Sequence, residues 1–251
     1  LTGKHSFVNG KVDNVQKFNW DQESFPKLLQ KNGYQTALIG KIHLDGLPTG
    51  FDYSAVLPGQ GNYYNPDFVI NGKPQQLHGY VTEITTDLAL NWLKNRDMDK
   101  PFCLLYHQKA PHREWLPAPK YYEQYTKMKF AEPETLFDDY SGRGTAAKTA
   151  EMNILTDMNW SGDSKLYPEI MSALGIQETT NWGIGAFNQN LGRMDDAQRA
   201  AWDDVYRPIA EDFEKKYPSM DKKELMHWRY ERYMQDYLGS IASVDEGVGQ
   251  V

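Results

Sequence analysis

Two short apolar runs, each leading directly into basic side chains, constrain the fold of this chain more than any other feature. The first, residues 35–39, ends at Gly40 and leads into Lys41 and His43. A short apolar run of this kind predicts a buried strand. In α/β enzymes, functional side chains gather beyond the carboxyl ends of such strands. Lys41 and His43 are therefore candidates for chemistry.

The second apolar run covers residues 102–106 and predicts another buried strand. It contains Cys103, which is the single cysteine of the chain and excludes an internal disulfide. We interpret Cys103 as a buried strand residue and not as a nucleophile. The run leads into residues 107–119, where three prolines predict a stiff loop.

Helical patterns alternate with these strands. Ser24 is the expected N-cap of a short helix over residues 24–32, and Thr82 is the expected cap of a second helix. Apolar residues of the second helix recur at helical spacing at Ile84, Leu88, Trp92 and Leu93. Since strand–helix alternation is typical of parallel sheets, we expect an α/β fold with a large, mostly parallel mixed sheet flanked by helices.

A hairpin and a long helix complete the expected elements. The pair Asn71-Gly72 favours a turn that joins residues 68–70 to a strand in the region 77–81. Asp221 and Glu224 have the spacing of a capping box, which predicts the start of a long helix that continues through Val248.

No Gly/Ser-rich linker divides the chain, so we expect one domain over residues 1–251, incomplete at both ends. Residues 131–220 carry no recognisable motif and are expected to be a variable insertion that shapes a substrate pocket.

The net charge of −7 argues against a general nucleic-acid binder, although it leaves room for a local basic pocket. No apolar run approaches the roughly 20 residues that span a membrane.

Lys41 and His43 suit chemistry on an anion. A fixed ammonium group can hold an anionic substrate and stabilise developing negative charge, and an imidazole can move protons near neutral pH. In extended backbone, two residues separated by one position point to the same side. The alternative is a solvated lysine beside a hydrogen-bonded histidine, which would need no function.

The loop after the second strand contains four further candidates. His112 follows Pro111, and a rigid loop can hold a histidine where a leaving-group oxygen needs a proton. Its alternative role is structural. Arg113 could reach an anionic substituent through its fork of donors, or lie on the surface. His107 and Lys109 are candidates only because they lie at the same strand exit.

Metal ligands and sugar-stacking rings are less specific signals. The pairs Asp138-Asp139, Asp195-Asp196 and Asp203-Asp204 could supply carboxylates to a hard metal, but we interpret them as solvated, and we assign no metal ligand in this chain. The 7 tryptophans and 16 tyrosines would suit a sugar-binding cleft and would equally suit core packing.

The segment Gly33-Tyr34-x-Thr36-Ala37-x-x-Gly40-Lys41-x-His43-Leu44 closely resembles the second signature of the type I sulfatases. These enzymes of the alkaline phosphatase superfamily hydrolyse sulfate esters with a formylglycine nucleophile. Their first signature, Cys/Ser-x-Pro-Ser-Arg, is followed shortly by Leu-Thr-Gly, which resembles the opening residues 1–3. We therefore expect this chain to be an internal piece that lacks the nucleophile.

The resemblance implies roles for individual residues. Lys41 would contact the sulfate and the formylglycine hydroxyl, and His43 would assist the nucleophile and the expulsion of sulfate. His112 would protonate the departing sugar oxygen. Arg113 and Lys109 are weaker candidates for substrate binding. The full-length parent would need calcium, whose ligands would lie outside this chain.

The loop 107–119 most resembles bacterial sulfatases that act on sulfated glycans, including N-acetylglucosamine-6-sulfatase-like members. The expected substrate is therefore a sulfated saccharide of the glycosaminoglycan or mucin type, and the expected location is periplasmic or secreted. Two alternatives are a phosphodiesterase or phosphonate hydrolase of the same superfamily, and a non-catalytic relative that binds sulfated glycan. We expect the isolated chain to be inactive.

Overall fold

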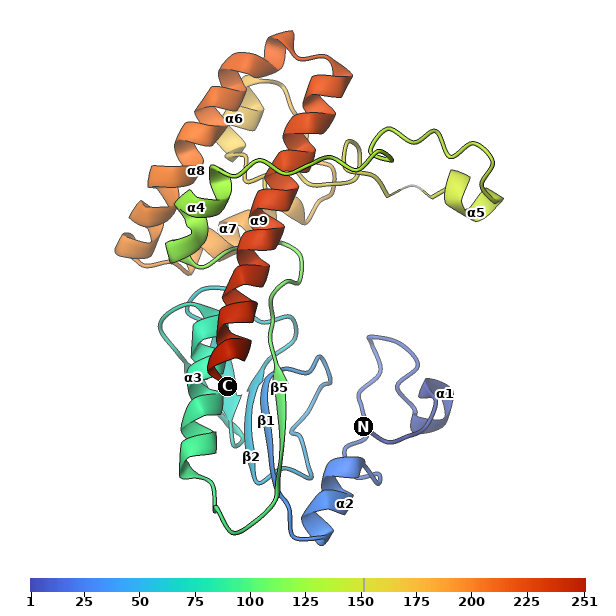
Figure 1. Ribbon diagram of the computed structural model, residues 1–251, viewed down its shortest axis with the longest axis vertical. Helices are drawn as coiled ribbons and strands as arrows, with labels where there is room; N and C mark the ends of the chain where they lie inside the picture. The colour runs from blue at the N-terminus through green and yellow to red at the C-terminus, as the bar shows by residue number, and fades with distance from the viewer. Residues whose placement is uncertain (151) are drawn as a thin grey trace. The chain divides into compact units, whose positions relative to one another are not determined.

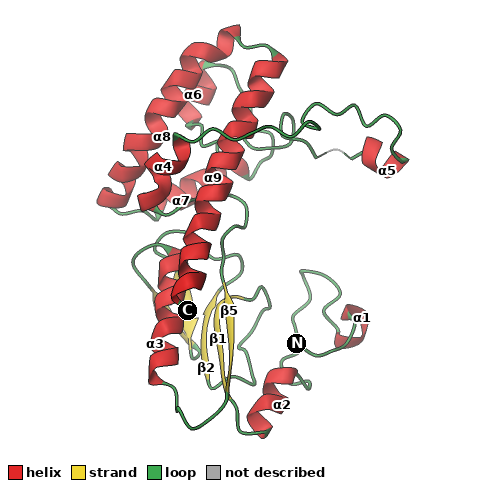
Figure 2. Ribbon diagram, in the orientation of Figure 1, coloured by secondary structure: helices red, strands yellow, loops and turns green. Residues whose placement is uncertain are grey.

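The computed structural model describes residues 1–150 and 152–251. These residues form two compact units, shown in Figures 1 and 2. The sheet unit comprises Leu1–Ala110 with Ser243–Val251, and the helical unit comprises Pro111–Ala242. The single domain over residues 1–251, with an insertion at 131–220, stays a prediction.

The sheet unit is an α/β structure, as predicted. Its elements are α1 (Ser6–Asn9), α2 (Phe25–Lys31), β1 (Gln35–Lys41), β2 (Tyr53–Leu57), β3 (Asp67–Ile70), β4 (Lys73–Gln76), α3 (Val81–Asn95) and β5 (Phe102–His107). The strands form one sheet in the order β4-β3-β2-β1-β5. β1 runs parallel to β2 and β5, whereas β2, β3 and β4 are joined by antiparallel pairings, so the sheet is mixed.

The core of the sheet unit centres on β1. Ala37, Leu38 and Ile39 are fully buried because β1 lies between two neighbouring strands and contacts α2 and α3. In α3 the expected N-cap at Thr82 is wrong. The helix already begins at Val81, because Tyr80 has extended backbone and its carbonyl accepts the first helical hydrogen bond from Ile84. Thr82 is therefore inside the first turn, where it is buried.

The hairpin turn at Asn71-Gly72 is confirmed, but its return strand differs from the prediction. Asn71 and Gly72 both have positive φ, at 47° and 81°, as a tight two-residue hairpin turn requires. Ile70 then pairs directly with Lys73, so the return strand is β4 and not the region 77–81. A two-residue turn leaves no room for the chain to pair later.

β5 is a strand, as predicted, but it is only partly buried. Phe102 is 42% exposed, and Cys103 is half-buried with a free thiol whose pKa is raised by burial. The reason is the position of β5 at the end of the strand order, where only one of its edges is paired within the sheet. An apolar run identifies a strand without indicating whether that strand is central or at an edge.

The helical unit packs around aromatic side chains. Its elements are η1 (Pro119–Tyr121), α4 (Tyr122–Thr126), α5 (Thr145–Lys148), α6 (Pro168–Ala173), α7 (Gly183–Gly192), α8 (Asp196–Lys216), η2 (Tyr217–Ser219) and the part of α9 (Lys222–Gln250) up to Ala242. Trp202 and Tyr206 of α8 are buried and stacked, with ring centroids 3.9 Å apart, and both rings meet Tyr122 of α4 edge-on. This cluster joins the short helices to α8.

Capping boxes define where the two long helices begin. The predicted box at α9 is confirmed: Glu224 N–H donates to Asp221 at 2.8 Å, and Asp221 N–H donates to Glu224 at 2.9 Å. Asp195 and Gln198 form the same arrangement at α8, so Asp195 is a cap and not simply a solvated carboxylate.

In the part of the chain that the structure describes, no helix combines the length and apolarity that crossing a membrane requires.

Candidate active site

The parallel pairing of β1 and β5 brings basic residues together at the carboxyl ends of these two strands. Gly40 lies opposite His107, the last residue of β5, so Lys41 leaves β1 where β5 ends. Figure 1 shows β1 and β5 side by side. The strands approach each other so closely here that a Cβ on Gly40 would lie 1.8 Å from the His107 carbonyl oxygen. Gly40 also has a φ of +104°, which strongly favours glycine. The glycine before Lys41 is therefore required by the sheet itself.

Lys41 and His43 come together around Gln60. Lys41 Nζ donates to Gln60 Oε1, and Gln60 Nε2 lies 3.4 Å from His43 Nε2. Because an amide NH₂ group donates and does not accept, this contact is a hydrogen bond in the form of His43 whose Nε2 carries no proton. The expected extended geometry of this pair is wrong: β1 ends at Lys41, and His43 has a φ of +53°. The chain turns out of the strand, and Gln60 joins the two side chains.

Lys109 adds a second ammonium group to this cluster. It is only 6% exposed, and its Nζ donates to the Gln60 carbonyl oxygen at 3.2 Å and lies 4.5 Å from the centre of the Tyr63 ring. Lys41 is partly buried, and burial lowers its pKa. Two lysines thus bond to one residue, a concentration of positive charge that suits an anion. We define the basic cluster as Lys41, His43, Gln60 and Lys109.

Gln60 was not a candidate in the sequence. It lies in the turn Pro58-Gly59-Gln60-Gly61, which has no catalytic pattern. The topology supplies the missing signal: β2 is parallel to β1 with Leu57 opposite Lys41, so the residues after Leu57 lie at the same carboxyl ends of the strands.

His107 forms a structural contact at this end of the sheet. Its side chain forms a hydrogen bond with the backbone of Lys41, and burial lowers the pKa of His107.

His112 and Arg113 belong to the helical unit. His112 is exposed, and its Nδ1 contacts the Arg113 carbonyl oxygen. Arg113 is held by Asp163, which is completely buried: Arg113 Nε donates to Asp163 Oδ1 at 2.8 Å, and Nη2 donates to Oδ2. The hydrogen bond to Asp163 raises the pKa of Arg113. The charge of Arg113 is therefore balanced within the protein.

The described residues do not fit a calcium site. Within residues 1–150 and 152–251, no group of three or more His, Cys, Asp or Glu side chains could hold a metal ion. Members of the three aspartate pairs are engaged elsewhere: Asp138 pairs with Arg143, Asp195 caps α8, and Asp203 pairs with Arg199.

The motif around Lys41 and the fold that positions it have counterparts among known proteins. The model of the family described as Sulfatase matches residues 3–251. The chain belongs to the sulfatase family. This sulfatase chain is 44% identical over its whole length to a Bacteroides thetaiotaomicron protein named N-acetylglucosamine-6-O-sulfatase, of which it covers 44%. It is 28% identical, over 51% of its length, to the human protein named N-acetylglucosamine-6-sulfatase, of which it covers 28%.

A solved structure extends this similarity to the fold of the sulfatase chain. It matches with a TM-score of 0.87 and 44% sequence identity, over 100% of this chain and 49% of the other. That structure is described as a complex with its substrate, D-glucosamine-2-N,6-O-disulfate. The sulfatase chain spans less than half of the length of the curated relatives it matches. The expected α/β fold and family are confirmed, while the roles of individual residues stay predictions.

Proposed function

We propose that the full-length protein hydrolyses sulfate esters on sulfated carbohydrates, with 6-O-sulfated glucosamine or N-acetylglucosamine as the sugar. The observation that carries this proposal is the basic cluster at the end of β1, within a chain that is 44% identical to an N-acetylglucosamine-6-O-sulfatase throughout its length. A sulfate group is an anion that two fixed ammonium groups would hold. Lys41 and Lys109 supply these groups.

Lys41 is proposed to hold the sulfate, and His43 and His112 are proposed to transfer protons. Lys41 steadies the negative charge that builds up on the sulfate oxygens. His43 is proposed to assist the nucleophile, since an imidazole can move protons near neutral pH. His112 is proposed to protonate the departing sugar oxygen, since it is exposed and sits in a proline-rich loop. Formylglycine would supply the nucleophile in the full-length protein.

Two further properties are proposed for the full-length protein on the basis of family resemblance. One is a calcium requirement, with ligands outside this chain. The other is export to the periplasm or to the outside of the cell, where sulfated glycans are met. A calcium requirement would be tested by metal analysis of the purified full-length protein.

The proposed function is tested by measuring sulfate release by the full-length protein from 6-O-sulfated N-acetylglucosamine. The Lys41→Ala and His43→Ala variants should each lose about a hundredfold or more in kcat/KM. Lys4→Ala, which changes an exposed lysine, serves as the control. Faster hydrolysis of phosphate diesters than of sulfate esters would replace the proposal with a phosphodiesterase. Glycan binding without any hydrolysis would replace it with a binding protein.

A further inference from the structure

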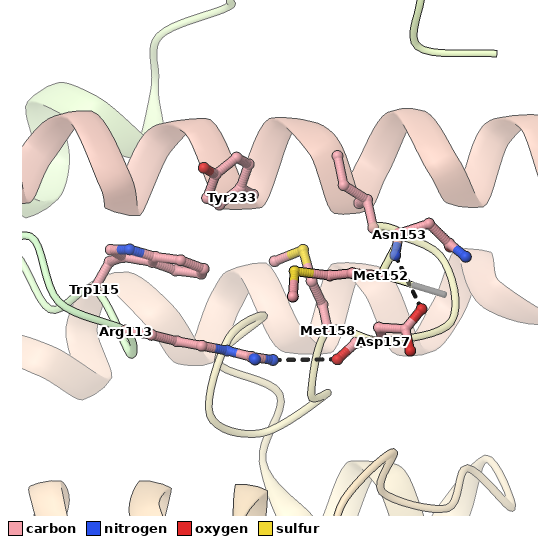
Figure 3. A pocket seen from close by; sticks show the side chains of 8 residues that line it. Arg113, Trp115, Met152, Asn153, Asp157, Met158 and Tyr233 are labelled. Atoms are coloured by element: carbon pink, nitrogen blue, oxygen red, sulfur yellow. Dashed lines mark hydrogen bonds between the residues drawn. The ribbon is translucent and has the colours of Figure 1, made fainter. Parts of the chain in front are cut away.

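The helical unit contains a pocket of about 300 Å³ with an aromatic wall (Figure 3). Trp115 from the proline-rich loop and Tyr233 from α9 form part of this wall, with ring centroids 4.8 Å apart and ring planes at 63°. Both rings are half-buried, so each keeps some surface open to the pocket. Met152 and Met158 add flexible apolar surface. The volume is at the lower end of small-molecule sites.

Polar groups lie along the opposite side of the pocket. In Figure 3, Arg113 and Asp157 lie across the pocket from Tyr233. Arg113 Nη2 donates to the Asp157 carbonyl oxygen at 3.2 Å, and the Asp157 carboxylate accepts from the Asn153 backbone N–H at 2.9 Å. Carboxylate oxygens with these fixed positions can accept further hydrogen bonds from hydroxyl groups.

The charges at the pocket do not suit an anion. Among the described residues that line the pocket, Arg113 is the one cation, and its charge is balanced by the buried carboxylate of Asp163. Asp157 adds a negative charge, and its hydrogen bonds with Thr156 and Asn153 lower its pKa, so it stays ionised at neutral pH. A sulfate group placed here would face this carboxylate, and the charges of the nearby Arg113 and Arg229 are already offset by those of Asp163 and Asp157. An uncharged ligand is favoured.

We propose that this pocket binds an uncharged pyranose ring of the glycan substrate. A pyranose ring has an apolar face that packs on aromatic rings and hydroxyl groups that bond to carboxylate and amide groups, which matches the two sides of the pocket. The inference rests on the proposed function, in which His112 protonates the departing sugar oxygen. Arg113, which follows His112 in the chain, lines the pocket.

The test is calorimetric titration of the chain with N,N′-diacetylchitobiose, an uncharged disaccharide. The wild-type chain should bind it saturably. Trp115→Leu and Tyr233→Leu should each weaken binding about fivefold, because they keep an apolar side chain and remove an aromatic ring. The matched control is Trp92→Leu in α3, a half-buried ring that also meets another aromatic ring, Phe102, edge-on. This variant should bind like the wild type.

Three results would overturn the inference: no saturable binding, equal binding by wild type and both pocket variants, or an equal loss in the control. If one pocket variant fails to fold, the other decides the question. The Lys41→Ala variant separates this inference from the proposed function. It should still bind the uncharged disaccharide, because the pocket is independent of the sulfate-holding lysine, and binding requires no hydrolysis. In that variant, tighter binding of D-glucosamine-2-N,6-O-disulfate than of the disaccharide would also overturn the inference.

Discussion

Gly40 shows how one residue links the family motif to the sheet. Replacement by alanine would put a Cβ 1.8 Å from the His107 carbonyl oxygen at a φ of +104°. We expect Gly40→Ala to lower the free energy of unfolding by about 3 kcal/mol, because backbone on both strands must move. Urea denaturation would measure this loss.

Gly33 is the matched control for Gly40. It also has a positive φ, at +82°, but a Cβ there would have no atom within 4 Å. Gly33→Ala should therefore cost only about 1 kcal/mol, the backbone contribution alone. Similar losses in the two variants would show that the close approach of β1 and β5 at Gly40 has no energetic effect.

Lys41 should make stability depend on pH in the alkaline range. Burial lowers its pKa below the ordinary lysine value of 10.5, so between these two values the unfolded chain binds more protons than the folded chain. The stability of the wild type should therefore rise with pH across this window, relative to Lys41→Met, which cannot titrate there. Between neutral pH and above 10.5, the urea midpoint of the wild type should rise relative to that of Lys41→Met. Parallel profiles would contradict this expectation.

At this scale the sequence identifies the reactive pair but not its geometry. Lys41 and His43 were predicted as neighbours in extended backbone, yet they meet through Gln60 because the chain turns at His43. Gln60 is 17 residues from His43 along the chain. A contact over this separation depends on which strand lies beside β1, and no local pattern encodes that choice.

The capping box of α9 is an element-scale feature whose contribution can be measured. Asp221 accepts the Glu224 N–H, which would otherwise lack a partner in the first turn of the helix. We expect Asp221→Ala to lower the free energy of unfolding by about 1 kcal/mol. The control is Asp212→Ala, which removes an exposed pair with Lys216 inside α8 and should cost about 0.5 kcal/mol or less. Equal losses would contradict a specific role for the cap.

Elements with periodic patterns were predicted better than their ends. The strands at 35–39 and 102–106 and the long helix are present, because burial imposes an apolar run on a strand and a helical spacing of apolar residues on a helix. Thr82 was wrong as a cap since Tyr80 ends the preceding extended segment. Asp195 and Gln198 have the same spacing as the recognised box of α9, but the adjacent Asp196 suggested a solvated acidic pair.

For the whole molecule, we predict that this chain is inactive alone, because it contains only part of the catalytic groups that sulfate transfer requires. It contains the proposed Lys41, His43 and His112, but within its described residues no metal-binding group of carboxylates, and no residue was assigned as nucleophile. Anion and proton-transfer groups without a nucleophile cannot complete sulfate transfer. The 251-residue chain should therefore release no sulfate above the blank from 6-O-sulfated N-acetylglucosamine, with or without added calcium, under conditions where the full-length protein is active.

The comparison is informative only if the isolated chain is folded. Near-ultraviolet circular dichroism and a cooperative unfolding transition would establish this, since the buried Trp202–Tyr206 stack should give a signal that is lost on unfolding. A folded, inactive chain together with an active full-length protein would place the missing groups outside residues 1–251. Sulfate release by the isolated chain that disappears in Lys41→Ala would instead show that the basic cluster acts with a nucleophile inside this chain, or with water.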